Sequence, residues 1–215
     1  MPGDQPGRAG HDDAHATGSA GSDRERWNAR YSGGFTASFR PHQLAERALA
    51  LPLPEGPVLD LASGPSGSVL LAAASGRPSV AVDLSDAAIG MLSEQARSQR
   101  PAGPVVVVQA DLETFRPRPA SCALVLCTGY WDSALFAAAA RAVLPGGLLA
   151  WEALTTQALR QRPGMPARWC LRPGEPASLL PAGYRVLVEE DPPPDGRPAR
   201  RRLLARAASR QRWPE

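Results

Sequence analysis

The sequence predicts an α/β fold with a Rossmann-like, mostly parallel seven-stranded sheet, helices on both faces and a C-terminal antiparallel hairpin. Three observations predict it. Short apolar runs bounded by turn residues alternate with helix-like segments between residues 58 and 154. A glycine-containing turn separates the first of these runs from the helix-like segment that follows. Two strand-like runs joined by a Pro- and Asp-rich turn come near the end of the chain.

The chain divides into one domain and two short tails. Its 215 residues, 43% of them apolar, suffice for one domain with a sizeable core. Residues 1–24 are rich in Gly, Ala, Ser and Asp and offer no apolar pattern to pack, so we expect a disordered tail there. We expect the domain to span residues 25–208, and residues 209–215 to form a second tail.

Composition narrows the class of protein. No uninterrupted apolar stretch approaches the roughly 20 residues that a membrane span requires, and no hydrophobic signal segment is visible. Three cysteines, Cys122, Cys127 and Cys170, are an odd number without metal-ligand spacing. We therefore expect a soluble cytoplasmic protein that binds neither a membrane nor a metal ion.

The first elements are a packed N-terminal cap, a helix and a buried strand. Four aromatic side chains within thirteen residues predict the cap: Trp27, Tyr31, Phe35 and Phe39. The apolar spacing over 44–51 is helical, and prolines and a glycine then break the chain. The apolar run over 58–62 is short and bounded by turn residues, which predicts a buried strand.

The next elements complete three strands. After the turn over 63–68, the apolar segment 69–74 predicts a buried helix, and 79–84 predicts a second strand. Ser85 can cap a helix through about Gln99. Four consecutive valines over 105–108 predict a third buried strand, which runs into Asp111.

The remaining elements are two more parallel strands and the hairpin. Residues 123–127 predict a fourth strand, 134–144 a helix, 145–147 a turn and 148–154 a fifth strand. Residues 157–181 are irregular. The runs 184–190 and 201–207 then predict the closing hairpin. In such a sheet, ligands bind in the crevice at the carboxyl ends of the first strands.

Gly64 and Asp83 are the first indication of a cofactor. A glycine turn after a buried strand lets the backbone approach a ligand, and an acid that ends the next strand can accept hydrogen bonds from two ribose hydroxyls. This spacing serves any cofactor that contains adenosine. It leaves NAD, FAD and S-adenosylmethionine open.

Four motifs resemble those of the class I S-adenosylmethionine-dependent methyltransferases in kind, order and separation. They are Val58-Leu59-Asp60-Leu61-Ala62-Ser63-Gly64-Pro65, Val80-Ala81-Val82-Asp83-Leu84-Ser85, Gln109-Ala110-Asp111-Leu112-Glu113 and Leu144-Pro145-Gly146-Gly147. The resemblance covers about residues 27–208. It implies methyl transfer from S-adenosylmethionine to a small-molecule acceptor.

The resemblance also implies which residues bind the cofactor. Asp60 lies near the methionine ammonium, Asp83 takes the ribose hydroxyls and Asp111 meets the adenine amino group. The other implied contacts come from Arg30, Ala62, Gly64, Leu84, Leu112 and Cys127. Two positions depart from the family pattern, because Ala62 and Ser66 stand where many members carry glycine. The Cβ of Ser66 narrows the turn, so a non-catalytic relative that binds cofactor, or nothing, is the alternative function.

A finer resemblance points to small bacterial methyltransferases related to the tellurite-resistance methyltransferases. It is carried by residues 27–31 and, downstream, by 129–131, 135–136, 151–152 and 171–175. It implies that the N-terminal segment folds over the cofactor. The catalytic candidates are Tyr31, Tyr130 and Glu152, while His42 is either an acceptor-site residue or a helix cap.

Two other functions are weighed against methyl transfer. A nicotinamide or flavin oxidoreductase would use the same crevice, but the irregular glycine turn and the Leu-Pro-Gly-Gly sequence argue against it. Nucleic acid binding rests on the C-terminal arginines, which we expect instead to lie on a solvated face of an edge strand, because no aromatic residues interleave them. These are Arg197, Arg200, Arg201, Arg202, Arg206, Arg210 and Arg212. No sequence pattern indicates the identity of the acceptor or the oligomeric state.

Overall fold

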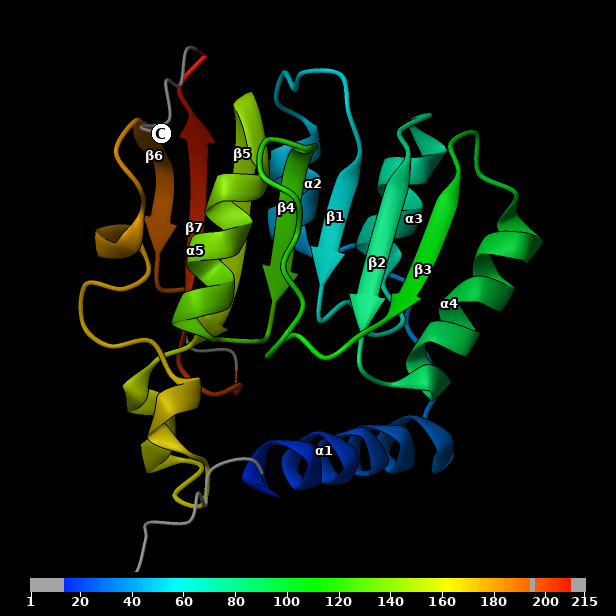
Figure 1. The fold of residues 1–215 in the computed structure, drawn as a ribbon, viewed down its shortest axis with the longest axis vertical. Helices are drawn as coiled ribbons and strands as arrows, with labels where there is room; N and C mark the ends of the chain where they lie inside the picture. Colours follow the sequence, from blue (N-terminus) through cyan, green and yellow to red (C-terminus); the bar gives the residue numbers. More distant parts are fainter. Residues whose placement is uncertain (1–13, 194–195, 210–215) are drawn as a thin grey trace, which may run out of the picture.

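The computed structural model, which describes residues 14–193 and 196–209, contains a seven-stranded sheet with the strand order β3-β2-β1-β4-β5-β7-β6 (Figure 1). Neighbouring strands from β3 to β5 are parallel, and β7 pairs antiparallel with both β5 and β6. The predicted fold class is confirmed. The strands are β1 Val58–Leu61, β2 Ser79–Asp83, β3 Val105–Gln109, β4 Cys122–Thr128, β5 Val143–Leu154, β6 Tyr184–Glu190 and β7 Arg200–Ala207.

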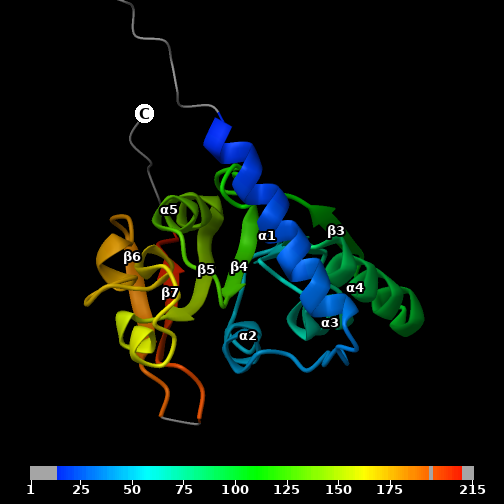
Figure 2. The same cartoon turned by 90° about the horizontal axis from the view of Figure 1, so that it is seen from below.

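Helices cover both faces of the sheet and one of its edges. The second, third and fourth helices pack on one face, α5 packs on the other, and α1 crosses beneath the carboxyl ends of the parallel strands (Figures 1 and 2). Three short 3-10 helices lie in the segment between β5 and β6. The helices are α1 Ala14–Ser32, α2 Gln43–Leu49, α3 Gly67–Ala74, α4 Asp86–Gln99, α5 Ser133–Ala142, η1 Thr156–Arg160, η2 Ala167–Trp169 and η3 Ala177–Leu179.

The third strand is less buried than its four valines predict. It lies at the edge of the sheet, and Val106 is 51% exposed. Side chains alternate between the faces of a strand, so α4 covers Val105 and Val107, while Val106 points to the face that carries no helix at this edge. An apolar run predicts a strand, but its burial depends on the strand order.

The fifth strand begins earlier than predicted. Helix α5 ends at Ala142, and β5 starts at Val143 and continues through the Pro-Gly-Gly segment that was predicted to be a turn. The pairing of β4 with β5 shifts register between Cys122 and Leu124, and Gly146 has a φ of 78°. The segment is therefore an irregular start of the strand, with the extra residues taken up by the bulge.

Helix α1 begins inside the segment that was expected to be a tail. Its described part holds alternating charges, and Asp23 and Arg26 form an ion pair at the helical spacing of three residues, with 3.1 Å between Oδ1 and Nη2. The expected domain start at residue 25 therefore falls within α1. Residues 1–13 of the expected first tail and 210–215 of the second lie outside the described residues.

Gly67 allows the chain before α2 to cross the start of α3. A Cβ placed on Gly67 would lie 2.2 Å from the backbone oxygen of Phe39 and 2.5 Å from the carbonyl carbon of Arg40. The obstacles are backbone atoms, which cannot rotate away as the end of a side chain can. Only glycine lets this segment approach the carboxyl edge so closely.

Replacing Gly67 with alanine is expected to destabilise the protein by about 1 to 3 kcal/mol, because the backbone must shift to relieve the overlap. Gly90→Ala is the matched control. Gly90 lies within α4 with nothing within 4 Å of an added Cβ, so that change should stabilise the protein by about 0.5 to 1 kcal/mol. Urea unfolding of both variants checks the pair, and equal stabilities would contradict the assignment.

Candidate functional site

The carboxylate of Asp83 joins the two turns at the carboxyl edge of the sheet. Its Oδ2 accepts a hydrogen bond from the backbone N of Gly64 at 2.8 Å, and its Oδ1 accepts one from the backbone N of Ser85 at 2.8 Å. Burial raises its pKa, although these backbone hydrogen bonds act in the opposite direction. Each carboxylate oxygen has two lone-pair sites, so both oxygens retain capacity for a further donor.

The turn after β1 has the left-handed backbone that its glycine pattern predicts. Gly64 has a φ of 56°, and Ala62 has a φ of 51°. Glycine reaches this region freely, whereas a residue with a Cβ does so at a cost of about 1 to 2 kcal/mol. Ala62 therefore keeps the family conformation at the position where many members carry glycine.

Ser66 has three hydrogen bonds that sequence reasoning missed. Its hydroxyl donates to Oδ2 of Asp60 at 2.6 Å, and the same oxygen accepts from the backbone N of Ser68 and of Val69. It is the N-cap of α3. The spacing of Ser66 ahead of an apolar helical run was the available signal for the cap.

Asp60 is a buried acid at the end of β1. It is 3% exposed, and this burial raises its pKa to about 7, against the hydrogen bond from Ser66 and the charge of nearby His42, which lower it. A carboxyl group in this state titrates near neutral pH. It lies near enough to Asp83 for the charge of Asp83 to raise its pKa further.

Helix α1 covers the glycine turn. The hydroxyl of Tyr31 would lie 2.9 Å from a Cβ placed on Gly64, and burial and the charge of Asp83 raise the pKa of Tyr31. Asn28 accepts from the hydroxyl of Ser85 and donates to Asp86, which also accepts from Arg24. Arg30 is exposed and lies over the ring of Trp27 at 5.6 Å.

The predicted adenine-side residues lie on the same edge, with unequal exposure. Asp111 is partly exposed and accepts from the backbone N of Glu113 at 2.9 Å, whereas Leu112 is 6% exposed within the core. Leu84 is partly exposed. Cys127 is fully buried at the end of β4, and burial raises its pKa well above the ordinary value, which makes its thiol inert.

Of the residues that follow β4, some pack in the core or cap a helix and others are partly exposed. Trp131 packs in an aromatic cluster with Phe136 and Trp151, and Asp132 caps α5 by accepting from the backbone N of Leu135 at 2.7 Å. These two residues have structural roles. Tyr130 is partly exposed, and burial and the charge of Asp132 raise the pKa of its hydroxyl.

Glu152 is the centre of a buried ion cluster. Its Oε2 accepts from Nε of Arg202 at 2.5 Å, and its Oε1 lies 3.5 Å from Nε of Arg200 and 3.3 Å from Nε2 of His42. Burial raises the pKa of Glu152, but the hydrogen bonds from His42 and Arg202 outweigh it, so the pKa is lowered. Both carboxylate oxygens are engaged.

This cluster corrects the expectation for the C-terminal arginines. Strand β7 is not an edge strand but lies between β5 and β6. The side chains of Arg200 and Arg202 are only 10% and 11% exposed, because their face of the strand meets Glu152. Arg201 points to the other face and pairs with Asp191. Arg210 and Arg212 lie outside the described residues.

His42 caps α2. Its Nδ1 accepts from the backbone N of Leu44 at 3.1 Å, so Nε2 carries the ring proton and donates to Glu152. Its own backbone N donates to the hydroxyl of Ser68. Of the two alternatives for His42, the helix cap is confirmed, and both ring nitrogens are engaged.

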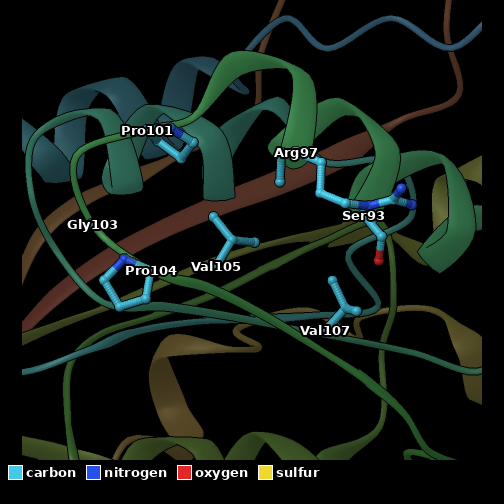
Figure 3. A pocket seen from close by; sticks show the side chains of 8 residues that line it. Ser93, Arg97, Pro101, Gly103, Pro104, Val105 and Val107 are labelled. Atoms are coloured by element: carbon cyan, nitrogen blue, oxygen red, sulfur yellow. The ribbon is translucent and has the colours of Figure 1, made fainter.

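A groove on the outer edge of the molecule contains none of the predicted site residues. It lies between α4 and β3 and is lined by Ser93, Arg97, Pro104, Val105 and Val107, among others (Figure 3). The predicted cofactor residues lie instead under α1. Among the described helices, none is long and apolar enough to cross a membrane.

The raised pKa of Asp60 makes the stability of the cofactor-free protein depend on pH. The folded chain holds this proton up to about pH 7, whereas the unfolded chain releases it near about pH 4. The folded state thus binds more protons in this window, and the free energy of unfolding falls as the pH rises, by about 1.4 kcal/mol per unit.

Asp60→Asn lacks this titration. Its stability relative to the unchanged protein should therefore increase from about pH 5 to about pH 8. Urea unfolding of both proteins across this pH range measures the difference in their free energies of unfolding. The titration of Asp83 is common to both proteins and cancels in this difference. Parallel stability curves would show that Asp60 titrates normally.

Glu152→Gln is expected to destabilise the protein by about 3 kcal/mol or more, because two buried guanidinium groups lose their counter-charge. Asp191→Asn is the control, since Asp191 pairs with Arg201 but its side chain is 51% exposed. That change should cost less than about 1 kcal/mol. Thermal and urea unfolding test this, and equal losses would rule out a special role for Glu152.

Comparison with known proteins gives one family and a set of similar folds. Residues 58–147, from β1 to the start of β5, match the family model described as a methyltransferase domain. Magnesium protoporphyrin IX methyltransferase from Synechocystis PCC 6803, solved with bound S-adenosylhomocysteine, is similar in structure, with 15% sequence identity and a TM-score of 0.65. The match covers 88% of this chain and 99% of that chain.

Two further solved structures share the fold. Geranyl diphosphate C-methyltransferase from Streptomyces coelicolor has 14% identity and a TM-score of 0.62, over 91% of this chain and 99% of that chain. TehB from Haemophilus influenzae has 12% identity and a TM-score of 0.63, over 84% of this chain and 66% of that chain. No curated protein sequence matches the chain.

The methyltransferase-domain match covers the strands that carry Asp60, Gly64, Asp83 and Asp111, and the sheet around them has the methyltransferase fold. Residues 58–147 therefore match a methyltransferase domain, within a sheet whose fold is shared by solved methyltransferases.

Proposed function

We propose that the chain transfers the methyl group of S-adenosylmethionine to a small-molecule acceptor at the carboxyl edge of its sheet. The observation that carries the proposal is the carboxylate of Asp83, which two backbone N–H groups hold in place. Such a fixed carboxylate has lone pairs left for the two ribose hydroxyls. The solved relatives of similar fold named for methyl transfer act on small molecules.

The cofactor residues form one continuous edge. Asp83 and Gly64 take the ribose, Asp60 lies on the methionyl side, and Asp111 and Leu84 lie on the adenine side. Their strands β1, β2 and β3 are neighbours in the sheet, which brings residues far apart in sequence to one edge. Ala62, Leu112, Cys127 and Arg30 complete the proposed cofactor set, with the buried Leu112 and Cys127 supporting the edge from below.

Catalysis by this site depends on positioning. S-adenosylmethionine supplies an electrophilic methyl group on a sulfonium, and an in-line displacement needs proximity and orientation more than a dedicated base. Tyr31 and Tyr130 are the candidates that wall the reacting centre. Glu152 is not proposed as a base, because both of its oxygens are held by cationic groups and His42.

The acceptor screen begins with the chemistry that the finer sequence resemblance implies. The resemblance to tellurite-resistance methyltransferases favours tellurite, selenite and small thiols as first acceptors. These soft or anionic nucleophiles need no proton acceptor in the protein, which fits the absence of a free base among the described site residues.

A non-catalytic relative is the second candidate. One structure of similar fold is described as a [4+2]-cyclase, so the fold does not require methyl transfer. Ser66 in the glycine turn favours this alternative, although its hydroxyl is turned to Asp60 and the start of α3. Cofactor binding without turnover on any acceptor would select it.

Asp83→Ala is expected to weaken S-adenosylmethionine binding by about 1 to 3 kcal/mol, because ribose hydroxyls lose their acceptor. Calorimetric titration measures the affinity, and NADH is titrated in parallel to test the oxidoreductase alternative. Glu94→Ala removes an exposed carboxylate from α4 and should leave the affinity unchanged. A folded Asp83→Ala protein with unchanged affinity would refute the cofactor assignment.

A further inference from the structure

Guanidinium and indole groups alternate along the surface where α1 meets the segment after β5. Trp169 lies under Arg168 at 5.5 Å and under Arg26 at 5.3 Å, measured from Cζ to the ring centroid. Trp27 lies under Arg26 at 5.8 Å and under Arg30 at 5.6 Å. We call this row of five residues the Arg–Trp rim.

The rim includes residues of the helix that covers the proposed cofactor residues. Helix α1 crosses the carboxyl edge of the sheet, and its Tyr31 covers Gly64 (Figure 2). Trp169 belongs to η2, in the segment that leaves the carboxyl end of β5. The contact between Arg26 and Trp169 therefore joins the cover of the cofactor residues to the segment beside the acceptor residues.

The rim has an excess of positive charge. The segment from Thr156 to Arg172 carries four arginines and no aspartate or glutamate, namely Arg160, Arg162, Arg168 and Arg172. Within the part of the chain that the structure describes, Arg26 pairs with Asp23, whereas Arg30 and Arg168 have no carboxylate partner. A surface of one sign at the entrance raises the local concentration of ligands of the opposite sign.

Stacking prepares these guanidinium groups to bind a carboxylate. A guanidinium that lies over an indole keeps its planar N–H edge available, and that edge matches the two oxygens of a carboxylate. The stacked side chain has also lost part of its rotational freedom before the ligand arrives. Arg26 and Arg168 share the ring of Trp169, so both guanidinium groups are held beside the same indole.

The same geometry argues against a nucleic acid ligand. Bases bind to single-strand surfaces by stacking on free aromatic faces. Each indole of the rim already carries two guanidinium groups, and Trp27 also stacks on Tyr31 with 6.2 Å between centroids.

We propose that the small-molecule acceptor carries a carboxylate apart from its methylated atom, as a small carboxylate-bearing thiol does, and that this carboxylate binds to Arg26 and Arg168 in the Arg–Trp rim. This inference rests on the proposed methyl transfer to a small molecule and adds the chemical class of the acceptor. Trp169 acts as a positioning residue, because it holds both guanidinium groups. The acceptor's reactive atom then lies beyond the rim, toward Tyr31 and Tyr130.

The test uses benzoate and benzamide, which have the same shape and differ in charge. The full chain, saturated with S-adenosylhomocysteine, is titrated with each probe by calorimetry at low ionic strength. We expect benzoate to bind at least roughly tenfold more tightly than benzamide. The double change Arg26→Gln and Arg168→Gln should abolish this preference. Arg185→Gln, which removes an exposed arginine of β6, should retain it.

Each other outcome overturns the inference. Equal affinity for the two probes, binding of neither, or a preference that survives the double change would show that the rim does not select carboxylates. Binding of poly(U) that the double change removes would assign the rim to RNA. Failure of the proposed function is distinguishable, because the unchanged protein would then not bind S-adenosylhomocysteine. The titrations of the cofactor-free protein would still test the rim.

Discussion

The carboxylate of Asp83 fixes the geometry on which the functional edge depends. One side chain at the end of β2 accepts hydrogen bonds from the turn after β1 and from the turn before α4. Without it, two βα turns from neighbouring strands would have no common anchor. The left-handed conformations of Ala62 and Gly64 persist because this anchor, together with the Ser66 cap of α3, determines where the turn must lie.

A second polar centre holds the other half of the sheet. Glu152 ties β5 to β7 through Arg202, and through His42 it reaches the start of α2. His42 also lies near Asp60, whose pKa its charge lowers. Hydrogen bonds join His42 to Glu152 and to Ser68 at the start of α3, whose N-cap Ser66 donates to Asp60. Burial makes each of these groups costly to leave unpaired.

Local sequence patterns predicted the helices and strands, but they could not predict which distant strands pair with each other. The apolar runs gave all seven strands, and Ser85 was predicted to cap α4 because a serine before a helical pattern satisfies free N–H groups. The prediction that Val106 is buried was wrong, because the position of a strand at the edge of the sheet depends on the strand order. The prediction that Arg202 lies on a solvated face was also wrong. Its partner Glu152 lies 50 residues earlier in the sequence and faces it only because of the β5–β7 register. Asp60 and Ser66 are near in sequence, but their hydrogen bond depends on the path of the turn.

The exposed edge formed by β3 bears on how the chain avoids aggregation. Four consecutive valines in an edge strand, which pairs on one side only within the described sheet, form a template on which another chain can add a strand. Pro101 and Pro104 precede the strand and cannot donate backbone hydrogen bonds, and Asp111 and Glu113 follow it with negative charge. Residues of these kinds act as gatekeepers beside an apolar segment. The same Asp111 that is proposed to meet adenine therefore also protects the growing sheet from misassembly.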